Sequence, residues 1–320
     1  MGIGSRIDLV NQAHKIETAS NSPSKYTGGI TIKSPQEREA MGRAGAIVGS
    51  ALRLLKSSVK PGMTTKDLDE IAYKEIIRHG AQPAFKGYRG FPASICASVN
   101  EEIVHGIPGK KVLREGDIVK MDVGATIDGF IGDAAISVAV GEVSEDAKRL
   151  MADTRQSLLE GIKAAKPGGR VGDIGAAVQR YSEERGYGVV REYVGHGIGR
   201  FLHEDPQVPN HGEAGRGPLL RVGMCIAIEP MLNIGGWQTK VLDDQWTVVT
   251  ADGSLSAHFE HTITVTEDGV EILDTGGGVL NAIQFFSDSP FLIINPDTIW
   301  DSKYIEDLKS MQKRIMCLNH

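Results

Sequence analysis

The chain has 320 residues, of which 41% are hydrophobic and 24% are charged, and these proportions are typical of a soluble globular protein. They exclude a disordered, fibrous or collagen-like chain. The formal net charge of -6 gives no electrostatic basis for binding nucleic acid. No apolar stretch approaches the length of a membrane span. We therefore expect neither a nucleic acid nor a membrane as a partner.

Cysteine is sparse, because Cys96, Cys225 and Cys317 are the three thiols and they lie far apart in the sequence. An odd number of widely spaced cysteines argues against a disulfide scaffold and favours a reducing compartment. The amino terminus also lacks the apolar core of a signal peptide. These features predict a cytoplasmic protein.

The first segment, residues 1–29, is polar, and we expect an amino-terminal extension there, with a mobile tail or a short helix at 8–16 as the alternatives. The first long helix is expected to follow it. Ser34 and Glu37 have the spacing of a capping box, with Ser34 as the N-cap. Apolar residues then recur at helical spacing as far as Leu55.

A second helix is expected to start with Thr65 as its cap and to end near residue 79. Strand-like segments follow it, and a second pair of helices is expected at 144–165 and 172–186. The strand-like segments, in chain order, are 94–99, 102–104, 117–124, 129–140, 188–194, 224–229, 245–250, 257–265 and 269–273.

The order of two helices followed by β-hairpins thus occurs twice. It predicts an α+β fold in which an antiparallel sheet is backed by helices, over residues 30–275. Residues 276–320 are expected to form a carboxy-terminal extension of unknown role, with a helix at 301–316. That extension either folds back on the main domain or forms a surface for association.

Two aspartates are expected on one face of a hairpin. Asp128-Gly129 lies between two alternating apolar segments and predicts a tight turn. Such a turn sets Gly124 opposite Asp133 and makes Asp122 the diagonal neighbour of Asp133. Buried carboxylates without partners are energetically costly, so a hard divalent metal is expected between them. Two solvated carboxylates on an exposed face are the alternative.

Other segments carry further metal-ligating side chains. Glu229 ends the apolar segment that begins at Met224, and Glu260 lies in another strand-like segment; each is equally compatible with a structural role. His196 and His203 belong to a glycine-rich stretch, where the backbone can approach a site closely. A satisfied core histidine is the alternative for each. The stretch fits neither the dinucleotide fingerprint nor a P-loop.

Taken together, these segments provide four carboxylates and one imidazole, which is more than one metal ion requires. Such a set suits two divalent cations about 3.5–4 Å apart that share carboxylates and a hydroxide. Oxygen ligands with one imidazole accept Co, Fe, Mn or Zn, so the pattern does not select among these metals. The set consists of Asp122, Asp133, His196, Glu229 and Glu260.

These residues lie in ordered blocks that resemble the type I methionine aminopeptidases. The resemblance extends over residues 30–273 and implies the pseudo-twofold pita-bread fold, which that family shares with creatinase and the X-Pro peptidases. The blocks that carry it, besides the Asp122 and Asp133 hairpin, are 87–92, 96–101, 105–108, 195–199, 203–206, 228–231 and 254–262.

The resemblance also implies a role for each candidate residue. The five residues named above match the metal ligands, and Asp133 and Glu260 match those that bridge both ions. Glu229 matches the carboxylate that also carries a proton. His105 matches a histidine that contacts the substrate near the scissile amide, and His203 one that stabilises the tetrahedral intermediate. The pocket for the methionine side chain is implied to consist of Tyr88, Phe91, Cys96 and Trp246.

The implied enzyme is a metal-dependent hydrolase that removes the initiator methionine from nascent proteins with a small second residue, by attack of a metal-held hydroxide on the scissile carbonyl. Nascent polypeptide amino termini would be its partners, with the ribosome as a further expected contact, and we expect a monomer. An X-Pro-type peptidase and a non-catalytic pita-bread binding protein are the alternatives. Phe85 and Leu202 depart from residues that some members carry beside the pocket, which leaves the fine substrate preference open.

Overall fold

The computed structural model describes residues 28–274. The helices expected at 8–16 and 301–316 lie outside these residues, and the extensions predicted at the two ends of the chain stay predictions. Within the described part, every helix is too short or too polar to cross a membrane.

The first helix pair consists of α2 (Pro35–Ser58) and α3 (Thr65–Arg78). The capping box at Ser34 is confirmed, because its hydroxyl accepts the Glu37 amide while the Glu37 side chain accepts the Ser34 amide. The cap of α3 was expected to be Thr65 and is instead Thr64, whose hydroxyl accepts a hydrogen bond from the amide of Asp67. Thr65 is the first helical residue, and its buried hydroxyl bonds to the loop at Gly109.

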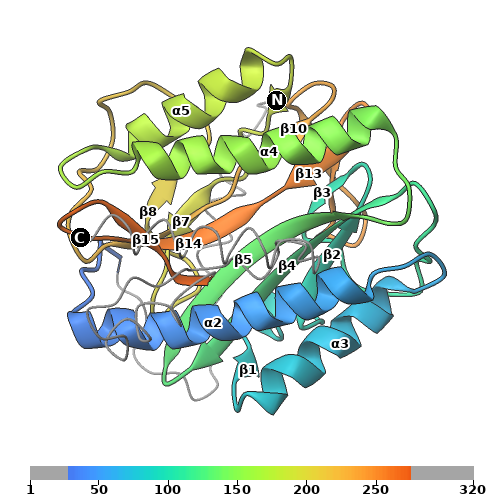
Figure 1. The fold of residues 1–320 in the computed structure, drawn as a ribbon, viewed down its shortest axis with the longest axis horizontal. Coiled ribbons are helices and arrows are strands. Elements are labelled where there is room, and N and C mark those ends of the chain that lie inside the picture. Colours follow the sequence, from blue (N-terminus) through green and yellow to red (C-terminus); the bar gives the residue numbers. More distant parts are fainter. Residues whose placement is uncertain (1–27, 275–320) are drawn as a thin grey trace, which may run out of the picture. The chain divides into compact units, whose positions relative to one another are not determined.

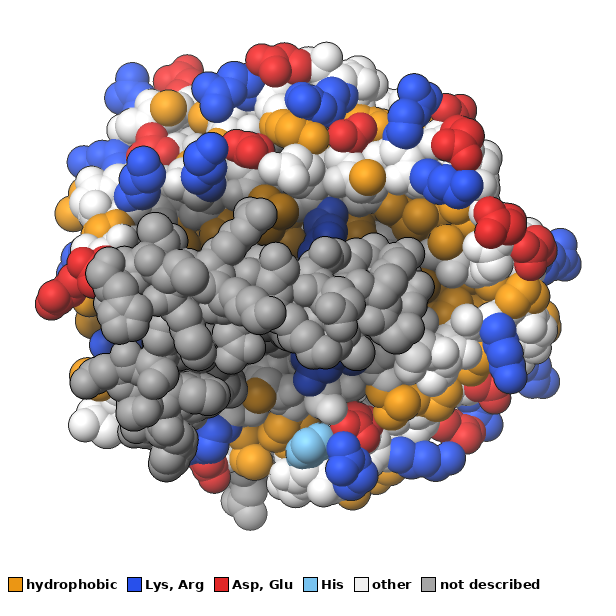
Figure 2. All heavy atoms as spheres, in the orientation of Figure 1, with side chains coloured by type: hydrophobic (Ala, Val, Ile, Leu, Met, Phe, Trp, Pro, Cys, Tyr) orange, Lys and Arg blue, Asp and Glu red, His pale blue; other side chains and the backbone are white. Residues whose placement is uncertain are grey.

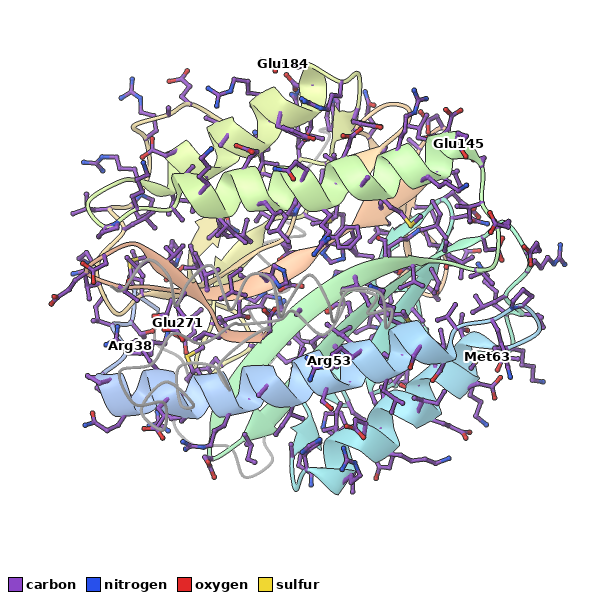
Figure 3. The ribbon with its side chains drawn as sticks, viewed as in Figure 1. Arg38, Arg53, Met63, Glu145, Glu184 and Glu271 are labelled. Carbon is purple, nitrogen blue, oxygen red and sulfur yellow. The ribbon has the colours of Figure 1, made fainter. Side chains whose placement is uncertain are left out.

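The second pair consists of α4 (Glu145–Ala164) and α5 (Val171–Glu183), so α5 ends before the expected residue 186. The first pair packs against β2 (Ile95–Val99), β4 (Ile118–Ile127) and β5 (Phe130–Ala139). The second pair packs chiefly against later strands, among them β8 (Glu204–Val208), β9 (Cys225–Ile228), β13 (Ser256–His258) and β14 (Glu260–Val265), and α4 also contacts β5. Figure 1 shows these two pairs as separate layers, which confirms the α+β architecture with helices backing an antiparallel sheet. Figure 3 shows α2 running from Arg38 past Arg53 towards Met63, with Glu145 and Glu184 near the ends of the second pair.

The described strands form one large and two small sheets. The large sheet has the order β1-β4-β5-β14-β9-β7-β8, with β2 paired to β4 and β15 to β14, and the small sheets have the orders β13-β10-β6 and β11-β12-β3. Strands of the large sheet are β1 (Gln82–Pro83), β2 (Ile95–Val99), β4 (Ile118–Ile127), β5 (Phe130–Ala139), β7 (Gly195–Gly197), β8 (Glu204–Val208), β9 (Cys225–Ile228), β14 (Glu260–Val265) and β15 (Val270–Ile272). The small sheets contain β3 (Glu102–Val104), β6 (Gly188–Val189), β10 (Met231–Asn233), β11 (Thr239–Val241), β12 (Val248–Thr250) and β13 (Ser256–His258).

Several strands differ from expectation. The segment 188–194 contributes only β6, and the strand expected at 257–265 is interrupted at Phe259, between β13 and β14. β1, β7, β8, β10 and β11 were not expected, because most are too short to show an alternating pattern. β8 does alternate between buried and exposed positions, but two of its buried positions are Glu204 and Pro206, so hydropathy conceals it.

The register of the β4–β5 hairpin is as predicted. Gly124 lies opposite Asp133 and Asp122 lies opposite Ala135. The turn is made by Asp128 and Gly129, with φ angles of 53° and 75°, the left-handed conformation that a two-residue type I′ turn requires.

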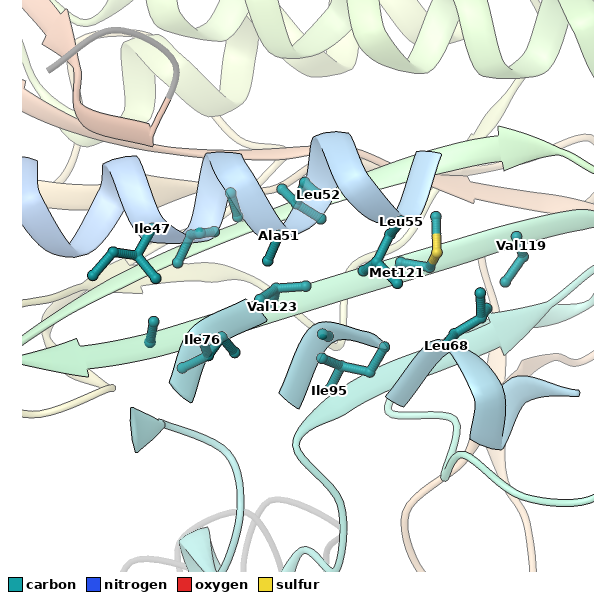
Figure 4. Packing of buried hydrophobic residues seen from close by; sticks show 14 of the residues in the cluster. Ile47, Ala51, Leu52, Leu55, Leu68, Ile76, Ile95, Val119, Met121 and Val123 are labelled. Carbon is teal, nitrogen blue, oxygen red and sulfur yellow. The ribbon is translucent and has the colours of Figure 1, made fainter. Parts of the chain in front are cut away.

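The two faces of this hairpin have different environments. Val119, Met121 and Val123 pack into a core cluster with Leu55 of α2 and Ile76 of α3 (Figure 4). Because successive side chains on a strand alternate between faces, the intervening residues point away from these helices. The apolar face therefore fixes the hairpin, and the opposite face is left for the polar residues of the site.

Charged side chains of both signs are interspersed over the face of the molecule that Figure 2 shows. The exposed parts of α2, α4 and α5 carry lysine, arginine, aspartate and glutamate close to one another. This mixture agrees with the modest net charge of the chain.

Candidate metal centre

Adjacent strands of the large sheet bring the five predicted ligands together. Asp122 lies on β4, Asp133 on β5, Glu260 at the start of β14, Glu229 directly after β9, and His196 on β7. These strands are consecutive neighbours in the sheet, in the order β4-β5-β14-β9-β7. One side chain from each strand therefore reaches the same region, although the residues span positions 122 to 260 of the sequence.

The register explains how the carboxylates approach each other. Ala135 pairs with Asp122 on one side and with Glu260 on the other, so the three form a row across the sheet. Next to Glu260 in β14, His261 pairs with Ile228, which places Glu229 beside Glu260. The methyl group of Ala135 is too small to separate the flanking carboxylates.

Three of the ligand atoms form a close group. Asp133, His196 and Glu260 each offer an atom within 4.8 Å of the others, and all three residues are buried. The Nε2 atom of His196 lies 3.8 Å from Oδ2 of Asp133 and 3.7 Å from Oε1 of Glu229. Its Nδ1 atom lies 2.9 Å from the carbonyl oxygen of Gly197, which leaves Nε2 directed at the carboxylates.

Burial dominates the electrostatics of the centre. It raises the pKa of Asp122 to about 7, and it raises the pKa values of Glu229 and Glu260 well above their usual range. The pKa of Asp133 is raised by burial and then by the charges of Asp122 and Glu229. Burial lowers the pKa of His196 to about 4, so its ring is neutral and able to ligate a metal.

Unpartnered oxygens show that cations fit this site. The atoms Oδ1 of Asp122, Oδ1 of Asp133 and Oε1 of Glu260 are buried and have no hydrogen-bond partner in the structure. Among residues 28–274, no lysine or arginine forms an ion pair with any of the four carboxylates. Carboxylate oxygens that neither basic side chains nor hydrogen bonds satisfy are the expected ligands of divalent metals.

An apolar cluster borders the carboxylates. Cys96 on β2 pairs directly with Asp122, and burial beside Asp122, Asp133 and Glu260 raises the pKa of its thiol. The predicted pocket residues all belong to one cluster, in which the ring of Phe91 meets that of Trp246 edge-on at 5.1 Å. That cluster contains Phe85, Tyr88, Phe91, Cys96, Leu202 and Trp246.

The two accessory histidines contact different residues of the site. His203 is exposed; its ring centroid lies 4.3 Å from that of His196, and its Nδ1 atom lies 2.7 Å from the hydroxyl of Tyr88. His105 meets the rings of Tyr193 and Trp246 edge-on, and burial lowers its pKa to about 4. The structure thus places His203 beside the ligand set and His105 beside the apolar cluster.

Sequence reasoning did not assign a role to His258, the last residue of β13. This side chain is buried, and its Nε2 atom lies 3.8 Å from Oε2 of Glu229. No local signal marked it, because β13 ends at His258 and Glu260 begins β14 in another sheet, so their two-residue spacing does not set a common face.

The comparisons with known proteins agree with this geometry. Residues 39–267 match the model of metallopeptidase family M24. The chain is 53% identical over 245 residues to the methionine aminopeptidase of Clostridium acetobutylicum, and 52% identical over 244 residues to methionine aminopeptidase 1 of Bacillus subtilis. Each match covers 76% of this chain and 98% of the relative.

Solved structures give the same result. The crystal structure of methionine aminopeptidase from Thermotoga maritima matches with a TM-score of 0.76 and 50% identity, over 77% of this chain and 99% of that one. A prolidase from Pyrococcus furiosus, at 23% identity and a TM-score of 0.63, shares the fold alone. The chain belongs to metallopeptidase family M24. Within that family it groups with the type I methionine aminopeptidases, which confirms the pita-bread fold and the resemblance seen in the sequence.

Proposed function

We propose that this protein removes the initiator methionine from the amino termini of proteins and that the centre on β4, β5, β7, β9 and β14 is its active site. The observation that carries the proposal is the convergence of five potential ligands, with buried oxygens that have no partner within residues 28–274, beside an apolar cluster. The methionine aminopeptidases that match along most of the chain support it.

The metal ligands in this proposal are Asp122, Asp133, His196, Glu229 and Glu260. Two divalent cations are favoured over one, because four carboxylates balance the charge of two dications. Asp133 on β5 and Glu260 on β14 are proposed to contact both cations, since these strands lie between β4, which carries Asp122, and β9, which Glu229 follows. Divalent cations bound here would polarise the scissile carbonyl and make water nucleophilic at neutral pH. Co, Fe, Mn and Zn all suit this ligand set.

Glu229 is proposed to carry the proton from the attacking water to the leaving amine. Its carboxylate is partly exposed, whereas Asp133 and Glu260 are buried, so it can reach both the centre and the substrate. Burial raises its pKa in the metal-free protein, so it binds a proton more readily than an exposed glutamate does, which suits a proton carrier.

His203 is proposed to donate a hydrogen bond to the oxygen of the scissile carbonyl. The Tyr88 hydroxyl lies 2.7 Å from Nδ1 of His203, and we propose that it donates to this nitrogen. The proton of the neutral imidazole then resides on Nε2. A donor fixed in this way stabilises negative charge that develops on the carbonyl oxygen.

The methionine side chain is proposed to bind among Tyr88, Phe91, Cys96 and Trp246. An unbranched thioether packs well against aromatic rings, and sulfur contacts at ring edges are favourable. The ring of His105 meets that of Trp246 edge-on, with the centroids 6.5 Å apart. We propose that His105 contacts the substrate backbone near the scissile amide. We further propose a small second residue in the substrate, nascent chains as its source, and the cytoplasm as the site of action.

The experiment that tests this proposal combines anaerobic purification, metal analysis and a peptide assay. We expect metal in the purified protein, cleavage of Met-Ala-Ser, and loss of cleavage after chelation with recovery on adding Mn²⁺ or Co²⁺. Ala-Pro serves as the contrasting substrate. Cleavage of Ala-Pro with Met-Ala-Ser left intact would contradict the proposal, and so would cleavage that persists in the fully chelated protein.

A further inference from the structure

His258 has a buried side chain near the metal centre, and hydrogen bonds fix its backbone. Its amide donates to the Ser137 hydroxyl at 2.9 Å, and that hydroxyl donates to the His258 carbonyl at 2.7 Å. On its other side, His258 pairs with Met231 of β10, two residues after Glu229. His258 is only 1% exposed, and these contacts fix the position of its ring relative to Glu229.

The ring nitrogens of His258 have no hydrogen-bond partner within the described part of the chain. Nε2 lies 3.8 Å from Oε2 of Glu229, while Oε1 of Glu229 lies 3.7 Å from Nε2 of His196. The Glu229 carboxylate thus lies between two imidazoles, of which one belongs to the proposed ligand set and the other does not. For a hydrogen bond, Oε2 must approach Nε2 by about 1 Å.

The surroundings of His258 leave Glu229 as its natural acceptor. Among residues 28–274, Glu229 provides the one carboxylate oxygen that lies within ion-pair distance of a His258 ring nitrogen, at 3.8 Å. Burial lowers the pKa of this ring to about 3, and His105 and Lys120 act in the same direction, so the ring is neutral. Lys120 is itself occupied, because its ammonium group donates to the carbonyl oxygen of Asn100. A buried imidazole N–H without an acceptor is energetically costly, which favours the contact with Glu229.

We propose that His258 is a positioning residue for Glu229: its Nε2–H donates to Oε2 and thereby leaves Oε1 to face the metal ions. Hydrogen bonds from outer residues hold a metal-ligating carboxylate in one orientation and tune its affinity for the ion. This inference rests on the role proposed above for Glu229.

The test compares two replacements of similar volume, His258→Gln, which keeps an N–H donor, and His258→Met, which does not. With Mn²⁺ as the metal and Met-Ala-Ser as the substrate, we expect His258→Met to lower kcat by about 10–100-fold with little change in KM. Calorimetric titration of Mn²⁺ into the metal-free protein should show affinity about tenfold weaker. His258→Gln should restore both quantities to within about threefold of the original.

Equal behaviour of the Gln and Met variants would overturn the proposal, because it would assign His258 a packing role alone. Thermal unfolding of the metal-free variants checks that both fold. Should neither fold, Ser137→Ala provides the milder change: it loosens the His258 backbone and should reduce Mn²⁺ affinity in the same direction.

Glu229→Gln in the same assays separates this inference from the proposed function. Retained turnover in Glu229→Gln would contradict the role of Glu229 itself. An inactive Glu229→Gln together with an unaffected His258→Met would leave that role intact and refute only the positioning role of His258.

Discussion

Two groups of buried ionisable side chains in this protein differ in whether the chain itself provides partners for their charges. On β8, Glu204 accepts hydrogen bonds from the Lys33 ammonium at 2.7 Å and from the amides of Arg200 and Phe201 at 2.9 and 3.2 Å. In the metal centre, Oδ1 of Asp122, Oδ1 of Asp133 and Oε1 of Glu260 are buried and have no hydrogen-bond donor within residues 28–274.

The pKa values separate the two groups. Burial acts to raise the pKa of Glu204, but Lys33 and the other donors outweigh it, so the pKa is lowered. Burial is unopposed by any cation in the metal centre, and there the pKa values rise. Lys33 therefore balances the charge of Glu204 within the chain, whereas the carboxylates of the centre need cations from solution to balance theirs. Buried charge alone does not identify a functional site; the missing partner does.

The largest effect should come from the centre. We expect His196→Ala to abolish turnover and to weaken Mn²⁺ binding by more than about 100-fold, because it removes a ligand. His203→Ala should lower kcat by about 10²–10³-fold while the metal content stays unchanged. Peptide hydrolysis and metal analysis of both variants provide the measurement. Equal metal loss in the two variants would contradict this division of roles.

The ion pair should affect stability without affecting metal. Lys33→Met leaves Glu204 buried and without its cation, and we expect the free energy of unfolding to fall by about 3–5 kcal/mol. Urea denaturation measures the loss, and metal content should match the original protein. The exposed Lys66, which lies 3.8 Å from Glu70, provides the control, since Lys66→Met should cost at most about 1 kcal/mol. A similar loss in both variants would remove the distinction between buried and exposed pairs.

The pH dependence of stability should have opposite signs for the two groups. In the metal-free protein the carboxylates of the centre have raised pKa values, so the folded state binds more protons than the unfolded state. The free energy of unfolding of the metal-free protein should therefore rise as the pH falls from about 7, the pKa of Asp122, towards 4. Denaturation in chelator at several pH values measures this rise, and Asp122→Asn should reduce it.

At lower pH the sign should reverse. Glu204 and Glu75 have lowered pKa values, about 2 for Glu75, where hydrogen bonds from Arg78 lead the causes. Their contribution is present above the unfolded value of about 4.5 and is lost as the pH falls through the folded value. A chelated protein that loses stability steadily from pH 7 downwards would contradict the contrast.

The smallest effect should come from Tyr88→Phe. The change removes the hydroxyl that lies 2.7 Å from Nδ1 of His203 and leaves the ring in place. We expect kcat to fall by about 3–10-fold, in line with about 1 kcal/mol for one hydrogen bond, and metal content to stay constant. A KM effect without a kcat effect would instead assign the hydroxyl to substrate binding.

Local signals made much of the site predictable. The Asp128-Gly129 turn sets the register of β4 and β5, so the positions of Asp122 and Asp133 followed from a few neighbouring residues. The ligand set could then be assembled because each carboxylate stands out in apolar or glycine-rich sequence.

Features that depend on distant contacts were not predictable. Lys33 and Glu204 are 171 residues apart, and the sequence near each residue contains no pattern that indicates the other as its partner. β8 was missed because Glu204 occupies a buried position that hydropathy assigns to an apolar residue. His258 was missed because its relation to Glu229 depends on the pairing of β10 with β13.

The place of β14 between β5 and β9 has a consequence for how the enzyme matures. The β4–β5 hairpin can form early from local contacts, but Glu260 joins it only when one of the last described strands inserts into the middle of the sheet. High-affinity ion uptake must therefore follow synthesis of nearly the whole domain, and the arrival of the ions then locks the first and second halves together. The complete set of proposed ligands is thus available only in a domain whose large sheet has formed.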